Sequence, residues 1–262
     1  RTADAPDPAQ IIADMHEEFK LGLDRLTLLS SGPVYLCQSA PDPVLANMPE
    51  RIEVARFSGS FAAGLSGTHI HRLAPSTTDA VWCINYQDVI ALGHLAGSGQ
   101  LPQTRIVAIS GSRAEQRFLC RAPMGSNLRN LTTGKFAEKA QTQNTMVMSG
   151  DPITGFPSTH LARFDHQVSI EASRSLGKPR SSSENPRPII PTASLVDALP
   201  FGVPALPVMR ALSIADFERA TSLQCSSMIE EDVASLNKLC ASNADYGPLL
   251  RRYLDHMQEA IG

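Results

Sequence analysis

Hydrophobic positions in the first part of the chain follow a helical and then an extended spacing. Apolar side chains recur every three or four residues at Ile12, Met15, Phe19, Leu23 and Leu26. This spacing predicts an amphipathic helix that Asp7 caps and that ends before Pro33. Extended runs at 34–37 and 51–57 predict strands, and residues 82–95 fit a further helix. This order is typical of an open α/β sheet, and because the segment starts with a helix, we expect the first strand of that sheet to be missing.

Strand-like runs between Gly and Pro turns dominate the next part of the chain. They lie at 105–111, 117–121, 145–150 and 166–170, and residues 127–131 fit one short helix. Strands with one helix predict a small α+β domain, of which the β-grasp is one form. A Pro- and Ser-rich linker and then amphipathic helical stripes follow. The predicted limits are 1–102 for the α/β domain, 103–176 for the α+β domain, 177–192 for the linker and 193–262 for the helical C-terminal region.

The composition excludes several classes of protein. The chain is 42% hydrophobic with a formal net charge of −3, and no apolar run approaches the ~20 residues that cross a bilayer. Lys and Arg are scattered, so we expect no binding of nucleic acid. The five cysteines include no CxxC pair, which argues against zinc ribbons, iron–sulfur clusters and disulfide frameworks and favours a reducing, cytoplasmic setting. Because the chain begins at Arg1 without Met or a signal segment, we expect it to be processed or cut from a longer protein.

The stretch Gly67-Thr68-His69-Ile70-His71 is the densest in candidate chemistry. In a strand, His69 and His71 would project from one face and offer two imidazoles to a metal, an anion or a carbonyl group. A metal site needs a third ligand, and no carboxylate or cysteine stands at a supporting spacing, so we expect no metal site. The alternative is that these histidines serve the fold or contact a partner. The neighbouring glycines indicate a sharp turn or a close approach of the backbone.

A second polar group opens the second predicted helix. Asp88 and His94 would suit an acid/base couple, and Tyr86 offers a hydroxyl donor to a carbonyl oxygen, as in a quinone site. The alternative, which we favour, is a helix capped by Asn85 or Asp88, with Trp82 among the side chains that pack inward.

No catalytic constellation is complete in the sequence. It contains no dinucleotide fingerprint after a strand, no P-loop and no G-x-S-x-G nucleophile elbow. Each cysteine lies in a run that is typical of buried segments, where a thiol is inert. We therefore expect no catalytic residue in this chain.

Longer strings of residues identify a family. The chain resembles the A subunit of the sodium-translocating NADH:quinone oxidoreductase, a respiratory sodium pump of bacteria, collinearly from about Pro8 to the C-terminus. The strings that carry the resemblance are Arg56-Phe57-Ser58-Gly59, Ala63 to His71, Asn85 to Gly93 and Tyr246 to Arg251.

The resemblance implies an architecture and a location. The family has an N-terminal barrel-sandwich region with no counterpart here, a Rossmann-like domain that is partial here, a soluble-ligand-binding β-grasp domain and a helical C-terminal region. Its members are peripheral subunits on the cytoplasmic side of the bacterial inner membrane, in contact with the other subunits and especially with the membrane-embedded B subunit. The flavins and iron–sulfur centre belong to partner subunits, so we expect no cofactor in this chain.

The resemblance also implies a role for the polar residues. We expect them to contact ubiquinone or a partner subunit of the NADH:ubiquinone reductase complex. They are Gly67, Thr68, His69, His71, Tyr86, Gln87 and Asp88.

Two departures from the family leave two hypotheses. The segment 173–191 is shorter than usual, and the family's Cys-Pro-Gly-Lys string reads Cys240-Ala241-Ser242-Asn243. The first hypothesis is a subunit without catalytic residues of its own that contributes to assembly of the pump. The alternative is a stand-alone module of the same family, in which the glycine-rich loop and the β-grasp domain bind a small ligand.

Overall fold

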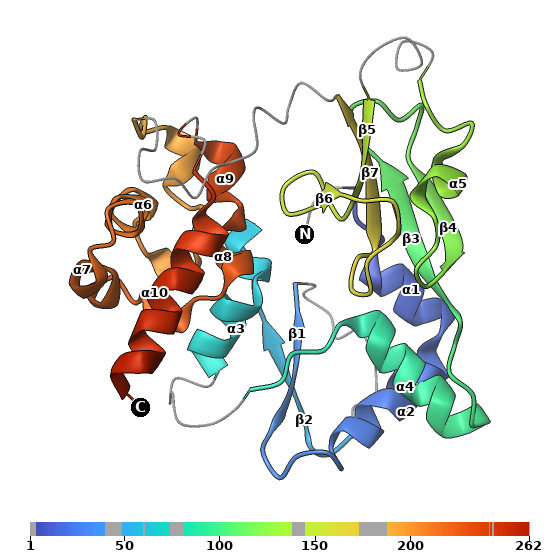
Figure 1. Ribbon diagram of the computed structural model, residues 1–262. Coiled ribbons are helices and arrows are strands. Elements are labelled where there is room, and N and C mark those ends of the chain that lie inside the picture. The colour runs from blue at the N-terminus through green and yellow to red at the C-terminus, as the bar shows by residue number, and fades with distance from the viewer. Residues whose placement is uncertain are drawn as a thin grey trace. The chain divides into compact units, whose positions relative to one another are not determined.

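The computed structural model describes residues 4–39, 49–59, 61–73, 81–137, 145–172, 188–240, 242 and 244–261. The chain forms two compact units, and each is discontinuous in sequence (Figure 1). Thr2–Ser58 and Trp82–Ser173 make one, here called the two-sheet unit, and Gly59–Val81 and Arg174–Gly262 make the other, here called the helical unit.

Two helices open the two-sheet unit where the apolar spacing predicts one. α1 (Pro8–Asp14) begins after Asp7, whose carboxylate accepts a hydrogen bond from the Ala9 N–H at 3.3 Å. α2 (His16–Leu26) follows after Met15, which leaves the helical conformation with φ −127° and ψ 43°, so the prediction of one unbroken helix is wrong. Both helices still bury the apolar stripe, at Ile11, Ile12, Phe19 and Leu23.

The smaller sheet packs on these helices. β1 (Val34–Gln38) and β2 (Ile52–Arg56) pair in parallel, as expected for an α/β segment. α4 (Tyr86–Ser98) lies side by side with α2 (Figure 1) and adds Val89 and Ile90 to the same core.

Glycines let α2 and α4 cross at backbone contact. A Cβ built on Gly93 would lie 1.7 Å from the carbonyl oxygen of Glu18, and one on Gly22 would lie 2.0 Å from that of Val89. No side chain fits at either position, so this close crossing requires glycine. It also fixes the position of α4, whose first turn carries Tyr86, Gln87 and Asp88.

The larger sheet of the same unit runs, within the described residues, in the order β4-β3-β7-β5-β6. β3 and β7 are parallel, whereas the other neighbours are antiparallel. The strands are β3 (Thr104–Ser110), β4 (Phe118–Pro123), β5 (Thr145–Ser149), β6 (Phe156–Pro157) and β7 (Gln167–Ala172).

One short helix covers the core of this sheet, as the sequence predicts. α5 (Leu128–Thr132) is capped by Asn127, whose side chain accepts hydrogen bonds from the N–H groups of Arg129 and Asn130. Leu128 packs into the sheet core with Val107, Ile109, Val168 and Ile170. The chain is thus a mixed α/β protein with two sheets in its described part.

The helical unit contains the C-terminal region and one segment from the middle of the chain. That segment holds η1 (Phe61–Gly64) and α3 (Ser66–Leu73). The C-terminal elements are η4 (Ala193–Leu195), η5 (Pro200–Gly202), α6 (Ala205–Ser213), α7 (Phe217–Ser222), η6 (Cys225–Ser227), α8 (Glu230–Ala234), α9 (Leu236–Leu239) and α10 (Tyr246–Ile261).

The core of this unit forms between the C-terminal helices. Leu212, Leu236, Leu250 and Tyr253 are fully buried there. Of the predicted linker, residues 177–187 lie outside the described residues. None of the described helices is both long and apolar enough to span a membrane.

Candidate functional site

The residues around His69 form a helix, so the strand considered for them is wrong. In α3 the Thr68 hydroxyl donates to the carbonyl oxygen of Ala62 at 2.7 Å, and His69 Nε2–H donates to that of Ala63 at 2.9 Å. These bonds satisfy carbonyl groups of the preceding η1 turn and tie it to the helix.

The helix changes what the two histidines can do together. Residues two apart on a helix point in different directions, so His69 and His71 do not form the same-face pair considered for a strand. Burial lowers the pKa of His69, so its imidazole is neutral at neutral pH. Among the residues that the structure describes, no group of His, Cys, Asp or Glu could hold a metal ion.

Gly67 lies against a buried carboxylate of α8, in the helical unit (Figure 1). The side chain of Asp232 has no exposed surface, and its Oδ2 accepts the backbone N–H of Ile229 at 3.0 Å. The backbone of Gly67 also faces this carboxyl group and acts to lower its pKa. Burial, more than any other cause, raises the pKa of Asp232 to about 6.

Three other candidates, Tyr86, Gln87 and Asp88, form the first turn of α4 in the two-sheet unit. Asn85 caps the helix as expected, and its side chain accepts the Gln87 N–H at 3.0 Å. Trp82 does not pack inward as expected, because 82% of its surface is exposed.

Gln87 joins α4 to the larger sheet. Its side-chain Nε2 donates to the carbonyl oxygen of Ile106 at 2.9 Å, and its Oε1 accepts the Ile106 N–H, also at 2.9 Å. Nε2 donates as well to the Tyr86 hydroxyl at 3.1 Å. Gln87 therefore satisfies both backbone groups of one residue of β3, as a neighbouring strand would.

Asp88 lies between two arginines. Its Oδ1 is 3.0 Å from Arg163 Nη1 and 3.4 Å from Arg105 Nη2, and its side chain is 15% exposed. The Arg105 side chain is 6% exposed and that of Arg163 is 53% exposed, so one arginine lies beneath Asp88 and the other at the surface.

His166 completes a cluster that the sequence did not predict. Its ring lies 6.0 Å from that of Tyr86, centroid to centroid, and burial followed by Arg105 lowers its pKa to about 4. Arg105, Arg163 and His166 were missed as site residues. Arg105 carries the one usable signal, because a charge at an inward position of an apolar strand requires a buried partner.

The predicted site residues therefore fall in two separate units. Gly67, Thr68, His69 and His71 belong to the helical unit, and Tyr86, Gln87 and Asp88 belong to the two-sheet unit. Within the second unit they form, with Arg105, Arg163 and His166, the group here called the α4 cluster.

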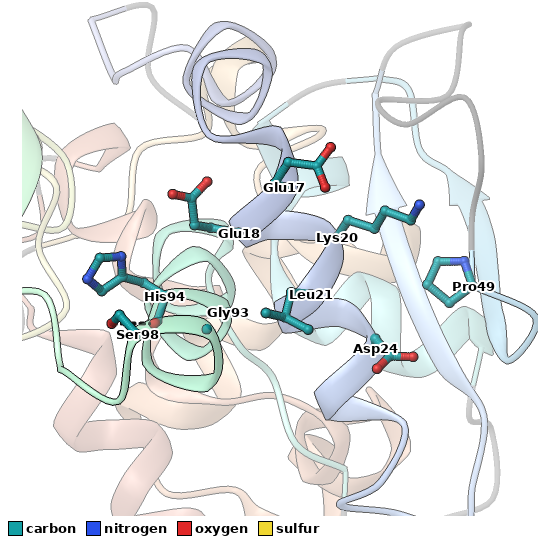
Figure 2. A pocket seen from close by; sticks show the side chains of 10 residues that line it. Glu17, Glu18, Lys20, Leu21, Asp24, Pro49, Gly93, His94 and Ser98 are labelled. Carbon is teal, nitrogen blue, oxygen red and sulfur yellow. Dashed lines mark hydrogen bonds between the residues drawn. The ribbon is translucent and has the colours of Figure 1, made fainter.

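A hollow lies between α2 and α4 of the two-sheet unit (Figure 2). Carboxylates of Glu17, Glu18 and Asp24 surround it, and Lys20 and His94 also line it. Of the two candidates for an acid/base couple, His94 lies at this hollow and Asp88 is held by its two arginines.

Most cysteines are shielded, as expected. Cys225 and Cys240 are buried and Cys37 is half-buried, and burial raises the pKa of Cys37 and of Cys225 to about 11. Cys83 is exposed, so the expectation that every cysteine is buried is wrong there.

Comparison with known proteins finds a matching family and similar proteins for this chain. Residues 3–101 match the family described as NqrA second alpha/beta domain. The chain is similar to the A subunit of the Na(+)-translocating NADH-quinone reductase from Yersinia pseudotuberculosis serotype O:1b (strain IP 31758), with 33% identity over 290 residues. The same subunit from Pasteurella multocida (strain Pm70) is 32% identical over 291 residues, and that from Rhodopirellula baltica is 30% identical over 285 residues.

These matches extend over nearly the whole of this chain but over only part of each relative. They cover 97%, 97% and 95% of this chain and 64%, 64% and 62% of the three relatives, respectively. The resemblance inferred from the sequence is confirmed by them: residues 3–101 belong to the family of the NqrA second alpha/beta domain, and the chain as a whole is similar to the A subunit of the Na(+)-translocating NADH-quinone reductases.

Proposed function

We propose that this chain works as part of the A subunit in a sodium-translocating NADH:quinone oxidoreductase. The observation that carries the proposal is similarity to that subunit over 97% of the chain. The chain spans about 64% of the length of the relative from Yersinia, so the activity of the whole complex is part of the proposal.

Within that complex the proposed role is assembly rather than chemistry. The chain has no catalytic residue in this proposal, and the flavins and the iron–sulfur centre lie in partner subunits. It is peripheral, on the cytoplasmic side of the bacterial inner membrane, and contacts the membrane-embedded B subunit. Its proposed domains are a partial Rossmann-like domain over 1–102, a β-grasp domain over 103–176, a linker over 177–192 and a helical region over 193–262.

Two regions are proposed to contact quinone or a partner subunit, because the candidate residues fall in two units; Gly67, Thr68 and Gln87 are the buried members of these regions. The first carries Gly67, Thr68, His69 and His71 on α3, and the second carries Tyr86, Gln87 and Asp88 on α4. The bonds of Thr68 and His69 to η1 support a role of α3 in holding shape. His71 is chosen for probing contact because its side chain is half-buried, whereas Thr68 is buried.

The test of contact compares His71→Ala with His69→Ala in the complete complex. Loss of quinone affinity or of assembly in His71→Ala, with His69→Ala affecting mainly stability, would support contact through α3. If His71→Ala changed neither quinone affinity nor assembly, contact through His71 would be rejected.

The test of the assembly role is reconstitution. The protein that carries this chain is mixed with the other subunits of the complex, and the product is separated by size. We expect one particle that contains the chain together with the B subunit. Separate elution of the chain under conditions where the other subunits assemble would reject the role in assembly.

The hollow between α2 and α4 favours one second candidate, a stand-alone module that binds a small ligand. This candidate predicts tight ligand binding by the purified chain without any partner. Gly97→Leu would narrow the hollow, since Gly97 lines it and a Cβ there meets only an ordinary contact of 3.5 Å with Leu21. Ligand binding that Gly97→Leu does not alter would exclude the hollow as its site.

A further inference from the structure

Arg105 is a buried cation with most of its hydrogen-bonding capacity unused. Its side chain is 6% exposed, and Nη2 alone is bonded, to Asp88 Oδ1 at 3.4 Å and to Met124 Sδ at 3.6 Å. Nε and Nη1 have no hydrogen-bond partner in the part of the chain that the structure describes. Leaving N–H groups of a guanidinium both dry and unbonded is costly, so the arrangement calls for an acceptor.

His166 shows the same deficit. Both ring nitrogens are buried without a hydrogen-bond partner among the described residues. Its backbone carbonyl accepts the Ala108 N–H at 3.0 Å, which holds the residue beside β3, the strand that carries Arg105. Because its pKa is about 4, the ring is neutral at neutral pH, with one N–H donor and one acceptor.

The charges around these donors favour an anion. Two guanidiniums, Arg105 and Arg163, share one oxygen of Asp88, and both arginines lower the pKa of His166. Asp165 is a second carboxylate near Arg105, and accepting the Ser149 hydroxyl at 2.5 Å does not remove its charge. At the His166 ring itself, the charges that shift the pKa are the two arginines, which lower it, and Asp88, which raises it.

The number of unbonded N–H groups on Arg105 and His166 indicates which kind of anion would fit. Arg105 offers one N–H on Nε and two on Nη1, and neutral His166 offers one more. A single water molecule accepts only two hydrogen bonds, so it would leave two of these four N–H groups without a partner. A carboxylate has about four acceptor positions and no hydrogens, and its flat shape matches a guanidinium.

We propose that the α4 cluster binds a carboxylate group, held by the unused N–H groups of Arg105 and His166 and covered by Arg163. Arg163 is the half-exposed member of the cluster, so in this proposal it is the side chain that must turn toward solvent to admit the carboxylate. The bound group is either a small free carboxylic acid or the carboxylate of an Asp, Glu or C-terminus on another chain. The proposal concerns residues of the two-sheet unit alone and does not depend on the proposed function.

The experiment uses the full 262-residue chain, labelled with 15N on its histidines. Formate and acetate are titrated at constant ionic strength against chloride, and the ring signals of His166 are followed by NMR. His166→Asn assigns those signals. We expect formate and acetate to shift the His166 signals to saturation, and chloride at the same ionic strength to leave them unchanged.

Three arginine variants test whether the arginines of the α4 cluster bind the carboxylate. Arg163→Gln should weaken binding on the order of tenfold through loss of one charge-assisted contact. Arg105→Lys should abolish saturable binding, because the planar fork is lost. Arg121→Gln removes an exposed arginine of β4 and should leave binding unchanged. Should Arg105→Lys fail to fold, Arg163→Gln still tests the proposal, because Arg163 lies at the surface.

A last arm separates the two sources of carboxylate. N-acetyl-aspartate amide presents an Asp side chain, and N-acetyl-asparagine amide is its uncharged control. Binding of formate and acetate alone supports a free small acid, and binding of the Asp compound but not the Asn compound supports a side chain of another chain. The proposal is overturned if no carboxylate shifts the His166 signals, if chloride shifts them equally, or if Arg163→Gln binds as tightly as the unmodified chain.

Discussion

Gly67 on α3 lies so close to Asp232 on α8 that a Cβ at position 67 would come within 2.3 Å of the carboxylate Oδ2. The two residues are 165 positions apart in sequence and belong to the same compact unit. This approach is possible because glycine has no side chain, and it brings the Gly67 backbone to a carboxylate that has no exposed surface.

Gly67→Ala should destabilise the chain. The new methyl group would overlap a buried carboxylate that cannot move to solvent, at an expected cost of about 1–3 kcal/mol in the free energy of unfolding. Unfolding by denaturant measures this loss of free energy. Gly97→Ala is the matched control, because its Cβ would meet Leu21 at an ordinary 3.5 Å. Equal stability of the two variants would contradict the close packing of α3 on α8.

Asp232→Asn should change how stability depends on pH. The pKa of Asp232 is raised from 3.8 to about 6 in the folded chain, so the folded state holds its proton more tightly than the unfolded state. Stability from this group is therefore full below pH 3.8 and falls as pH rises toward 6, by about 3 kcal/mol in all.

Asn at this position does not titrate, which isolates the effect. The free energy of unfolding of Asp232→Asn minus that of the unmodified chain should grow from pH 4 to 6 and then level off. A difference that stays constant with pH would mean that Asp232 has an ordinary pKa.

Gln87→Glu should weaken the junction between α4 and β3. The carboxylate keeps the acceptor for the Ile106 N–H but loses the donor to the Ile106 carbonyl oxygen and faces that oxygen with negative charge. We expect a loss of about 1–3 kcal/mol, smaller at acidic pH where Glu is protonated. Thermal unfolding measures it, with the exposed Gln103→Glu as control. A loss no larger than that of the control would refute the pairing.

The contribution of His166 to the free energy of unfolding should change with pH in the opposite direction to that of Asp232. Burial lowers its pKa from 6.5 to about 4, so the folded state binds fewer protons than the unfolded state in that window. Stability from this group is complete above pH 6.5 and is lost as pH falls toward 4.

Measuring the free energy of unfolding of His166→Asn and of the unmodified chain as a function of pH tests this dependence. The unmodified chain should lose more stability than the variant as pH falls through the window. Parallel curves for His166→Asn and the unmodified chain would show that His166 titrates normally.

Local spacing predicted those parts of the fold that depend on neighbouring residues. The period of the apolar residues placed α2 and α4, and extended runs placed β1 and β2, because amphipathic patterns follow the period of each element. The break at Met15 was missed, since nothing in the apolar period distinguishes one helix from two. The strand considered for His69 is wrong because the segment is helical, and its side chains bond to η1, which the local sequence pattern did not show.

The candidate site could be predicted only where it is local. Tyr86, Gln87 and Asp88 follow each other along the chain, so their clustering at the start of a helix was visible. Arg105 and His166 join them only through the pairing of β3 with β7, and the contact of Gly67 with Asp232 bridges segments that no pattern links. Spacing carries no information about which distant segments meet.

The most direct measurement of the proposed function is the NADH:quinone turnover and sodium uptake of vesicles that carry the other subunits. The two rates are compared with and without the protein that contains this chain, at equal amounts of the other subunits. We predict that both rates depend on its presence and return when it is added back. Undiminished turnover and sodium uptake in its absence would contradict the account.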